Sequence, residues 1–317
     1  MQTLGLALYQ KLYLIRQVTE RIRKEYPQDQ IKTPVHLSMG EEAIAAGVCH
    51  AIGQRGQFFG TYRNHGLYLS LTLETDKFFA ELYGKKTGAS GGKAGSMHLT
   101  APEAGLAGTS AVVGTTIPMA VGAAFANKVQ SKDKIVVVFF GDGALDEGVF
   151  WESFNTACVM KLPMIFVCED NGLAPHTKKD ERQGYSSIVD IVDQFDCVTF
   201  ESETSDVQNI YKLVWGAEKT AKILQCPAFM RLEYYRYLEH VGINEDFDQG
   251  YRTREEFEEW LKVDPVKLQR DHLLSIFLEK EVLEIEEKVN DQIERSVELA
   301  KEADFPDKEE LFKGVLA

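Results

Sequence analysis

The sequence predicts an α/β protein built on a mostly parallel sheet that is flanked by helices on both faces. Three short apolar segments, bounded by turn or breaker residues, have the character of buried parallel strands: 135–140, 164–168 and 229–234. Between the first two, residues 147–161 carry apolar side chains at helical spacing. Strand, helix and strand in succession predict a βαβ unit with a right-handed crossover.

Three further helices are predicted around this unit. The first 26 residues have the pattern of an amphipathic helix, and residues 114–129 form a small-residue helix that can pack closely on a sheet. With no internal repeat and no low-complexity linker, residues 1–317 are predicted to form a single domain with an N-terminal helix and a C-terminal helical extension. The extension has one apolar face, which must be covered by this chain or by another: Val282, Ile285, Val289, Ile293, Val297 and Ala300.

Two stretches show no clear period. Residues 84–107 contain six glycines, and residues 240–250 are polar and irregular. Long irregular stretches in a compact protein are usually functional loops or disordered ones. The glycines are compatible with a backbone that lies against a ligand or a partner chain.

The formal charge of -14 is concentrated near the end of the sequence, because residues 255–317 hold 19 acidic and 9 basic residues. This surplus is typical of a solvated helical face, and it argues against a nucleic acid partner. The five cysteines include no C-x-x-C pair, which favours a reducing compartment without a zinc site or disulfides. No signal peptide and no apolar run of about 20 residues is found, so a cytoplasmic protein without membrane association is expected.

The strongest chemical signal follows two of the predicted strands. Gly141, Asp142, Gly143 and Ala144 end the first strand, and Asp170-Asn171 ends the next one after 26 intervening residues, 144–169. The carboxyl ends of parallel strands share one edge, so Asp142 and Asn171 are predicted to face one spot. A carboxylate and an amide oxygen suit Mg2+, and the N–H groups of residues 143 and 144 can approach a pyrophosphate.

This spacing resembles the thiamin diphosphate motif, which usually reads Gly-Asp-Gly followed by an Asn-Asn pair. Over nearly the whole chain, the sequence is similar to the alpha subunits of the 2-oxo acid dehydrogenases that act on pyruvate, branched-chain 2-oxo acids or acetoin. The resemblance implies the thiamin diphosphate-binding fold. Further segments match this family at residues 62–66 (Tyr-Arg-Asn-His-Gly), 93–98, 161–163, 251–256 and 305–312.

The resemblance implies a role for each matching position. Mg2+ would be held by the side chains of Asp142 and Asn171 and by the carbonyl group of Leu173. His65 and His240 would lie near the reactive thiazolium carbon, and the backbone of Ala111 and Val113 would touch the aminopyrimidine. The pyrophosphate would be held by Gly143, Ala144, Tyr62, Arg63, Arg236 and His240.

The basic residues also have an independent physical rationale. A diphosphate carries several negative charges, and arginine offers paired donors to them. Taken alone, Tyr62-Arg63 is more often a strand end with a surface salt bridge, and a lone histidine is more often a hydrogen-bonded structural residue. His240 gains weight because it lies between a strand end and a polar loop. The other histidines are predicted to be structural: His36, His50, His98, His176 and His272.

A second chain is implied by what the sequence lacks. In the family, the glutamate that activates the aminopyrimidine belongs to a beta subunit. The chain is therefore expected to be inactive alone and to work in an alpha2beta2 assembly, with a lipoyl acyltransferase as a possible acyl acceptor. The reaction implied is decarboxylation of a 2-oxo acid, or cleavage of acetoin, with transfer of the acyl group to a lipoyl acceptor.

Three positions depart from the family pattern. Asp170 replaces an asparagine, Ala111 replaces a glycine and requires a negative φ, and residues 238–242 lose one histidine and a hydroxyl group while gaining an acidic residue. The last change motivates an alternative, an acyloin-forming transferase that adds a two-carbon unit to a ketone or sugar. A split transketolase, a non-catalytic scaffold subunit and a nicotinamide dehydrogenase are weaker alternatives.

Overall fold

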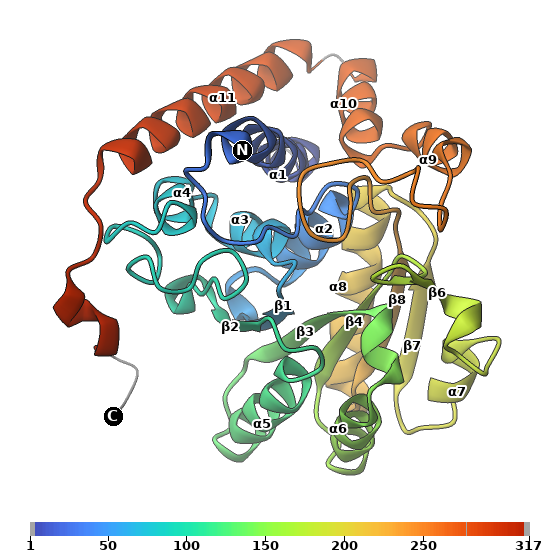
Figure 1. The fold of residues 1–317 in the computed structure, drawn as a ribbon. Helices are drawn as coiled ribbons and strands as arrows, with labels where there is room; N and C mark the ends of the chain where they lie inside the picture. Colours follow the sequence, from blue (N-terminus) through green and yellow to red (C-terminus); the bar gives the residue numbers. More distant parts are fainter. Residues whose placement is uncertain (1–3, 277, 314–317) are drawn as a thin grey trace.

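The computed structural model of this chain describes residues 4–276 and 278–313. Its centre is a six-stranded sheet in the order β2-β1-β3-β4-β8-β7, in which all neighbouring strands are parallel (Figure 1). The α/β fold with a parallel sheet is therefore confirmed. In chain order the strands are β1 Gly56–Thr61, β2 Leu106–Ser110, β3 Ile135–Gly141, β4 Met164–Asp170, β7 Val198–Ser202 and β8 Ala228–Glu233.

Helices cover both faces of the sheet, as the sequence predicts. One face packs against α5 (Thr116–Val129), α6 (Gly148–Val159) and the short α7 (Ile188–Val192). The opposite face packs against α1 (Leu4–Glu25), α2 (Glu42–Ile52) and α8 (Val207–Leu224). Two short helices, α3 (His65–Thr72) and α4 (Asp76–Leu82), follow β1 on the side of α1 and α2.

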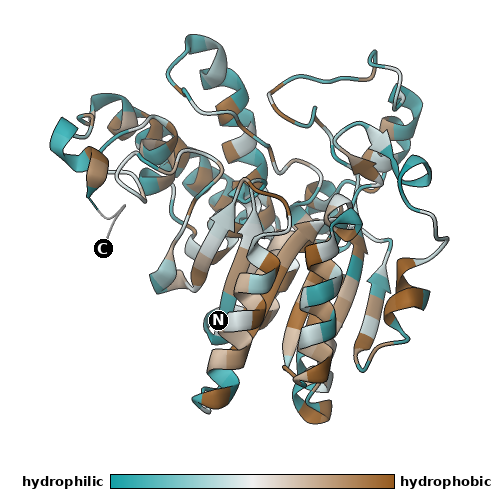
Figure 2. Cartoon of the chain, turned by 60° about the horizontal axis from the view of Figure 1, so that its bottom comes forward, coloured by the Kyte–Doolittle hydropathy of each residue, from teal (hydrophilic) through white to brown (hydrophobic). Residues whose placement is uncertain are grey.

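The central strand β3 shows how one apolar run serves both faces. Successive side chains of a strand point to opposite sides of the sheet. Ile135, Val137 and Phe139 belong to the core under α1, α2 and α8, whereas Val136, Val138 and Phe140 belong to the core under α5 and α6. A strand buried on both faces must be apolar at every position, which is why β3 lacks the alternation of a half-exposed strand. Figure 2 shows this hydrophobic colour along the central strands.

The C-terminal extension is covered by this chain itself. Helix α11 (Glu279–Glu302) packs against α1 and α4, and α10 (Pro265–Ser275) packs against α1 (Figure 1). Helix α9 (Arg254–Leu261) precedes them and begins with a capping box formed by Thr253 and Glu256. All six predicted apolar positions of α11 are buried: Val282, Ile285, Val289, Ile293, Val297 and Ala300.

The predicted strands and helices agree with the structure to within a few residues, but three strands of the six-stranded sheet are absent from the prediction. β1 contains two glycines, β2 mixes small and polar residues, and the edge strand β7 is only partly buried along its length. None of the three therefore shows the continuous apolar run that marks a buried parallel strand. That the whole chain forms one domain stays a prediction.

Among the described residues, no helix combines the length and the apolar character that crossing a membrane requires.

Candidate active site

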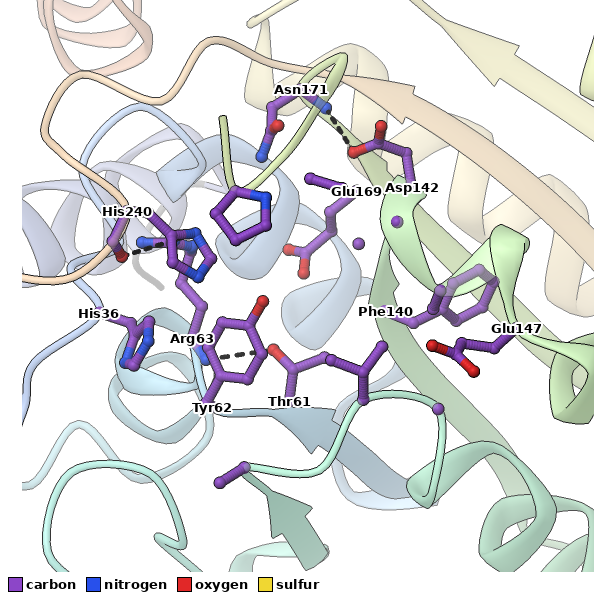
Figure 3. Close-up of a pocket in the computed structure, with 18 of the residues that line it drawn as sticks. His36, Thr61, Tyr62, Arg63, Phe140, Asp142, Glu147, Glu169, Asn171 and His240 are labelled. Carbon is purple, nitrogen blue, oxygen red and sulfur yellow. Dashed lines mark hydrogen bonds between the residues drawn. The ribbon is translucent and has the colours of Figure 1, made fainter. Parts of the chain in front are cut away.

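A cavity of about 490 Å³ lies where the carboxyl ends of the parallel strands meet (Figure 3). Its wall contains residues that follow β1, β2, β3, β4 and β8. Open parallel sheets bind their ligands at this edge. Ten of the twelve predicted site residues line the cavity: Tyr62, Arg63, Ala111, Val113, Asp142, Gly143, Ala144, Asn171, Leu173 and His240.

Asp142 and Asn171 meet at one side of this cavity. β3 and β4 pair in register, with Gly141 opposite Glu169, so the residues that follow these strands lie together. The backbone N–H of Asn171 lies 3.4 Å from Oδ1 of Asp142. Its Nδ2 donates to the Tyr234 hydroxyl at 2.7 Å, which fixes the amide orientation, and Oδ1 accepts from the N–H of Leu173 at 3.0 Å. A carbonyl oxygen has two lone pairs, so one remains for a cation.

The turn after β3 brings backbone close to the same side. Residues Asp142–Asp146 form a 3-10 turn, η4, which faces the small hairpin of β5 (Leu173–Ala174) and β6 (Thr177–Lys178). A Cβ atom on Gly143 would lie 2.9 Å from Cβ of Ala174, a distance that real Cβ atoms do not tolerate. Glycine at this position therefore lets the turn and the hairpin approach each other beside the cavity.

Burial changes the acidity of the carboxyl groups around Asp142. Burial, and then repulsion from Asp170, raises the pKa of Asp142 to about 7, although Arg182 opposes this shift. Burial would also raise the pKa of Asp170, but Lys179 and Arg231 hold it below its ordinary value. Asp170 thus pairs with two cations and does not line the cavity, whereas its neighbour Asn171 does.

Two buried guanidinium groups lie at another side. Arg63 donates to the carbonyl oxygens of Leu37 at 2.8 Å and His240 at 3.1 Å. Arg236 is one of the two predicted residues that do not line the cavity, because its donors reach the carbonyl oxygens of Pro175 and Leu238 and the Tyr251 hydroxyl. Burial, and then repulsion from Arg63, lowers the pKa of Arg236. Both guanidinium groups have carboxylate partners only at the long end of the ion-pair range, because Glu41 is 4.0 Å from Arg63 and Asp246 is 3.8 Å from Arg236.

His240 is a neutral hydrogen-bond donor in this arrangement. Its Nδ1 lies 3.4 Å from Arg236 and 3.5 Å from Arg63. A guanidinium group can only donate, so Nδ1 accepts and the ring proton sits on Nε2. Burial, followed by Arg63 and Arg236, lowers the pKa of His240 to about 3, which keeps the ring uncharged at neutral pH.

His36, which was predicted to be structural, lines the cavity. Its ring lies 4.4 Å from the Tyr62 ring and 5.3 Å from the His240 ring, between centroids. Its Nδ1 is buried without a hydrogen-bond partner in the described part of the chain. His36 lies in the stretch before α2, outside any motif, so only its position in the fold connects it with Tyr62 and His240 (Figure 3).

His65 is the second predicted residue that the structure keeps away from the cavity wall. It is fully buried at the start of α3, where Nε2 lies 2.7 Å from the Ser96 hydroxyl and the ring packs edge-on against Phe78. The prediction that His65 faces the reactive carbon is not met in this conformation. Its side chain points into the core and connects α3 with the glycine-rich segment instead.

Residues 110–114 form the wall after β2. Ala111 has no positive φ, which is the condition for alanine at a position where the family usually has glycine. Val112 and Val113 line the cavity and are also among the exposed large apolar residues of the chain. This wall is therefore both the side of the cavity and part of the surface.

Comparison with known proteins identifies the family of this chain. The family model described as "Dehydrogenase E1 component" matches residues 10–309. The chain belongs to this family. It is 30% identical to the alpha subunit of acetoin:2,6-dichlorophenolindophenol oxidoreductase of Bacillus subtilis, over 98% of this chain and 93% of the relative. It is 32% identical to the somatic mitochondrial pyruvate dehydrogenase E1 alpha subunit of Homo sapiens, over 97% and 78% of the two chains.

The E1 family resemblance predicted from the motifs is thus confirmed, and the structure explains the departure in residues 238–242. Glu239 does not line the cavity, because its carboxylate accepts from the N–H of Asn244 at 2.8 Å while its own N–H donates to the carbonyl oxygen of Asn244. Asp246 is buried against Arg252 and Tyr251. Glu239 and Asp246 therefore stabilise the conformation of this loop through hydrogen bonds and an ion pair. His240 is the residue of the loop that lines the cavity.

One residue that the sequence reasoning missed organises the glycine-rich segment of this E1 chain. The buried carboxylate of Glu81, in α4, accepts four backbone N–H groups: Ser90 at 2.7 Å, Gly92 at 3.0 Å, Ala94 at 2.7 Å and Gly95 at 3.1 Å. Gly92 has a φ of +77°, which turns the segment around the carboxylate. The wrapped segment leads directly to Ser96 and to Met97, which lines the cavity.

The buried neutral state of His65 generates a prediction about acid stability. Burial, followed by His36 and Arg63, lowers the pKa of His65 to about 3, from about 6.5 in an unfolded chain. The unfolded state therefore binds one more proton between these values, and the contribution of His65 to stability is lost as the pH falls. In the His65→Gln variant, the free energy of unfolding should fall less steeply with decreasing pH, by up to about 1.4 kcal/mol per pH unit.

Urea unfolding at several pH values between 6.5 and 4 measures this slope. His272→Gln, at an exposed position on α10, is the matched control and should keep the wild-type slope. Equal slopes for the wild type and His65→Gln would contradict the assignment of His65 as a buried neutral group.

Glu81 generates a second prediction. Glu81→Gln keeps the shape of the side chain but removes the charge that four N–H groups share, so the free energy of unfolding should fall by about 3 kcal/mol. Urea unfolding at pH 7 measures the change, and Glu103→Gln, at an exposed position of the same segment, should stay within about 0.5 kcal/mol of the wild type. If the free energy of unfolding of Glu81→Gln also stayed within about 0.5 kcal/mol of the wild type, the segment would keep its fold without the carboxylate.

Proposed function

We propose that this chain is the alpha subunit of a cytoplasmic, thiamin diphosphate- and Mg2+-dependent enzyme that decarboxylates a 2-oxo acid, or cleaves acetoin, and passes the acyl group to a lipoyl acceptor. One observation carries the proposal. A single cavity has oxygen groups suited to a hard cation at one side and the Arg63 guanidinium with the uncharged His36 and His240 at another, while Arg236 lies behind His240. A metal–diphosphate group has this same polarity, with its cation on one side of its phosphate oxygens.

The donor set at the first side fits Mg2+. The proposed ligands are the side chains of Asp142 and Asn171 and the carbonyl oxygen of Leu173, all of which border the cavity. Three protein oxygens leave octahedral positions for diphosphate oxygens and water. Among the described residues, no group of three or more His, Cys, Asp or Glu side chains is arranged to hold a metal.

The other groups fit the remainder of the cofactor. Arg63 and Tyr62 would bind the diphosphate together with the N–H groups of Gly143 and Ala144, and Arg236 would support them through His240. The unpartnered Nδ1 of His36 adds one buried polar atom at the same side. The backbone at Ala111 and Val113 would face the aminopyrimidine.

Thiamin diphosphate, when bound, supplies a carbon nucleophile and an electron sink for cleaving the bond beside a carbonyl group. His240 would act on the substrate as a neutral donor. Its proton is on Nε2 because both arginines occupy Nδ1, so Nε2–H can donate to the carbonyl oxygen as negative charge develops there. A charged imidazolium is not needed, and the low pKa of His240 disfavours one.

We further propose that the beta subunit, which would supply the missing glutamate in an alpha2beta2 assembly, docks beside the cavity on α5 and α6. A groove of about 400 Å³ runs between these helices, and its lining includes Pro118, Phe125 and Met160. Val149 in the groove lies against Gly114 of the cavity wall, and the exposed Met119 and Val129 extend the apolar surface along α5. A partner that contributes to this site must reach the cavity wall, and this apolar face borders that wall.

The alternatives are less favoured. An acyloin-forming transferase was motivated by the acidic loop after β8, but Glu239 and Asp246 are used inside that loop. A scaffold without catalysis would not need to keep Asp142, Asn171, Arg63 and His240 around one cavity.

The cofactor assignment predicts Mg2+-dependent binding of thiamin diphosphate to the chain co-purified with its beta subunit. Asp142→Ala should weaken binding by roughly 100-fold or more, because a lost charge-assisted contact of about 3 kcal/mol corresponds to that factor. Isothermal titration calorimetry with and without Mg2+ measures this, and Asp180→Ala, an exposed acidic position nearby, is the control. If a folded wild-type complex does not bind thiamin diphosphate, the cofactor assignment is wrong.

The docking face predicts the effect of a buried charge. Phe125→Glu should weaken assembly with the beta subunit by roughly 100-fold, because an unpaired carboxylate in an apolar interface costs about 3 kcal/mol or more. Co-purification and sedimentation velocity measure assembly, while circular dichroism checks the fold. Ile223→Glu places the same charge at an exposed apolar position on α8, at the opposite face of the sheet, and should leave assembly intact. Loss of assembly in Ile223→Glu but not in Phe125→Glu would place the interface on that face instead.

A further inference from the structure

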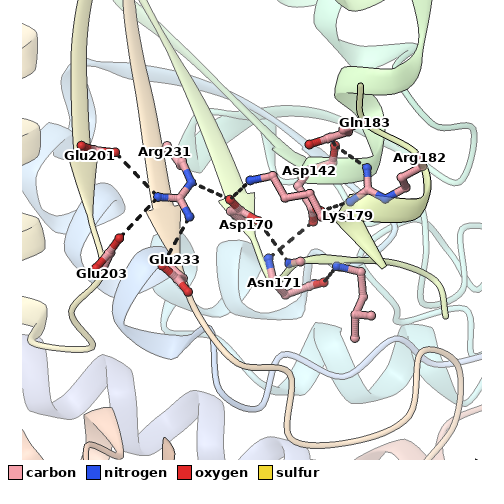
Figure 4. Close-up of polar contacts among 12 residues, drawn as sticks. Asp142, Asp170, Asn171, Lys179, Arg182, Gln183, Glu201, Glu203, Arg231 and Glu233 are labelled. Atoms are coloured by element: carbon pink, nitrogen blue, oxygen red, sulfur yellow. Dashed lines mark hydrogen bonds and ion pairs between the residues drawn. The ribbon is translucent and has the colours of Figure 1, made fainter. Parts of the chain in front are cut away.

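One short segment supplies cations to two acidic residues at the carboxyl ends of β3 and β4, Asp142 and Asp170. Lys179 Nζ lies 3.0 Å from Oδ2 of Asp170, and Arg182 forms an ion pair with Oδ2 of Asp142 (Figure 4). Both cations belong to the stretch 179–183 that follows the hairpin of β5 and β6. Arg182 belongs to none of the sequence motifs that point to the cofactor.

The guanidinium of Arg182 is held from two directions. Nη2 donates to Oδ2 of Asp142, while Nη1 donates to Oδ2 of Asp146 at 2.6 Å and to the carbonyl oxygen of Asp142 at 3.3 Å. Arg182 thus bridges the first and last residues of the turn η4. Gln183 reinforces the bridge, because its Nε2 lies 3.2 Å from Oδ1 of Asp146. The position of the guanidinium is therefore set by Asp146 as well as by Asp142.

Arg182 lies behind the carboxylate of Asp142 and outside the cavity. Asp142, Asp146 and Asn171 line the cavity, whereas Arg182 does not. The two oxygens of Asp142 consequently have separate roles. Oδ2 is taken by Arg182, and Oδ1 is directed to the N–H of Asn171, on the side of the proposed metal ligands.

We propose that Arg182 is a positioning residue for the metal: it fixes the Asp142 carboxylate so that Oδ1 is presented to a divalent cation beside Asn171. This inference rests on the proposed Mg2+ site. Outer partners that hold a ligand carboxylate typically change metal affinity by roughly 10–100-fold. Arginine suits the task because its planar fork stays charged and can hold two acceptors in fixed directions.

Two physical effects compete when Arg182 is removed, and they have opposite signs. Loss of a nearby positive charge relieves repulsion on the incoming cation and strengthens metal binding. Loss of the fork lets the Asp142 carboxylate turn away from Asn171 and weakens metal binding. The double attachment of Arg182 to Asp142 and Asp146 favours the second effect, and the sign of the change decides between them.

The test uses the chain in complex with its beta subunit and Mn2+ as the probe, with saturating thiamin diphosphate. Free Mn2+ is measured by its electron paramagnetic resonance signal, independently of catalysis. Arg182→Gln is expected to raise the dissociation constant of Mn2+ by roughly 10–100-fold. Lys179→Gln is the matched control, because it removes the same charge from the same segment. Lys179 pairs with Asp170 and not with Asp142, so this variant should change the dissociation constant of Mn2+ by less than about 3-fold.

Two further variants keep the test decisive if Arg182→Gln does not assemble. Arg182→Lys retains the charge without the fork, and Asp146→Ala removes the second attachment while leaving the Asp142–Arg182 pair in place. Each should weaken Mn2+ binding several-fold. Unchanged or tighter binding in the assembled Arg182 variants overturns the positioning role, as does equal weakening in Lys179→Gln. If the wild-type complex itself binds no Mn2+ with thiamin diphosphate, the proposed function fails rather than the role of Arg182.

Discussion

The parallel register of the sheet is the constraint on which the site depends. β3 and β4 pair residue by residue up to Gly141 and Glu169, and β4 pairs with β8 up to Asp170 and Glu233. Residues that are far apart in the sequence therefore leave the sheet at one edge. Each of five strands adds to the same cavity, through Tyr62 after β1, Ala111 after β2, Asp142 after β3, Asn171 after β4 and His240 beyond β8.

The electrostatic design of this edge is uneven. Around Asp142 and Asp170, buried carboxylates are paired with Arg182, Lys179 and Arg231. Around Arg63 and Arg236, the nearby carboxylates stay at 4.0 Å and 3.8 Å, and the guanidinium donors turn to carbonyl oxygens, a hydroxyl and His240. Buried charges that are paired only at such long distances remain poorly compensated. The second region is therefore suited to an anionic ligand. Burial, together with Arg63 and Arg236, lowers the pKa of His36 and His240 and keeps these histidines uncharged.

The fold and most of the site were predictable because their signals are local. Buried parallel strands such as β3 are apolar at every position, and Asp142 and Asn171 follow such strands directly. His36, Glu81 and Arg182 were not predictable, because each acts through a contact with a segment distant in sequence or outside any motif. The predicted position of His65, near the reactive carbon, differs from the observed one for a related reason. A motif identifies the residue, but whether its side chain faces a cavity or the core is decided by neighbours such as Phe78 and Ser96.

The order of the strands also has a consequence for how the chain acquires its structure. β8 begins at residue 228, yet it is inserted between β4 and β7 rather than added at an edge. Contacts of such long sequence separation form slowly. Tyr234, Arg236 and His240 follow β8, so no chain emerging from the ribosome can complete the cavity before about three quarters of its length has been made. A ligand of this cavity would consequently stabilise the finished fold and not the early folding steps, which take place before its site is complete.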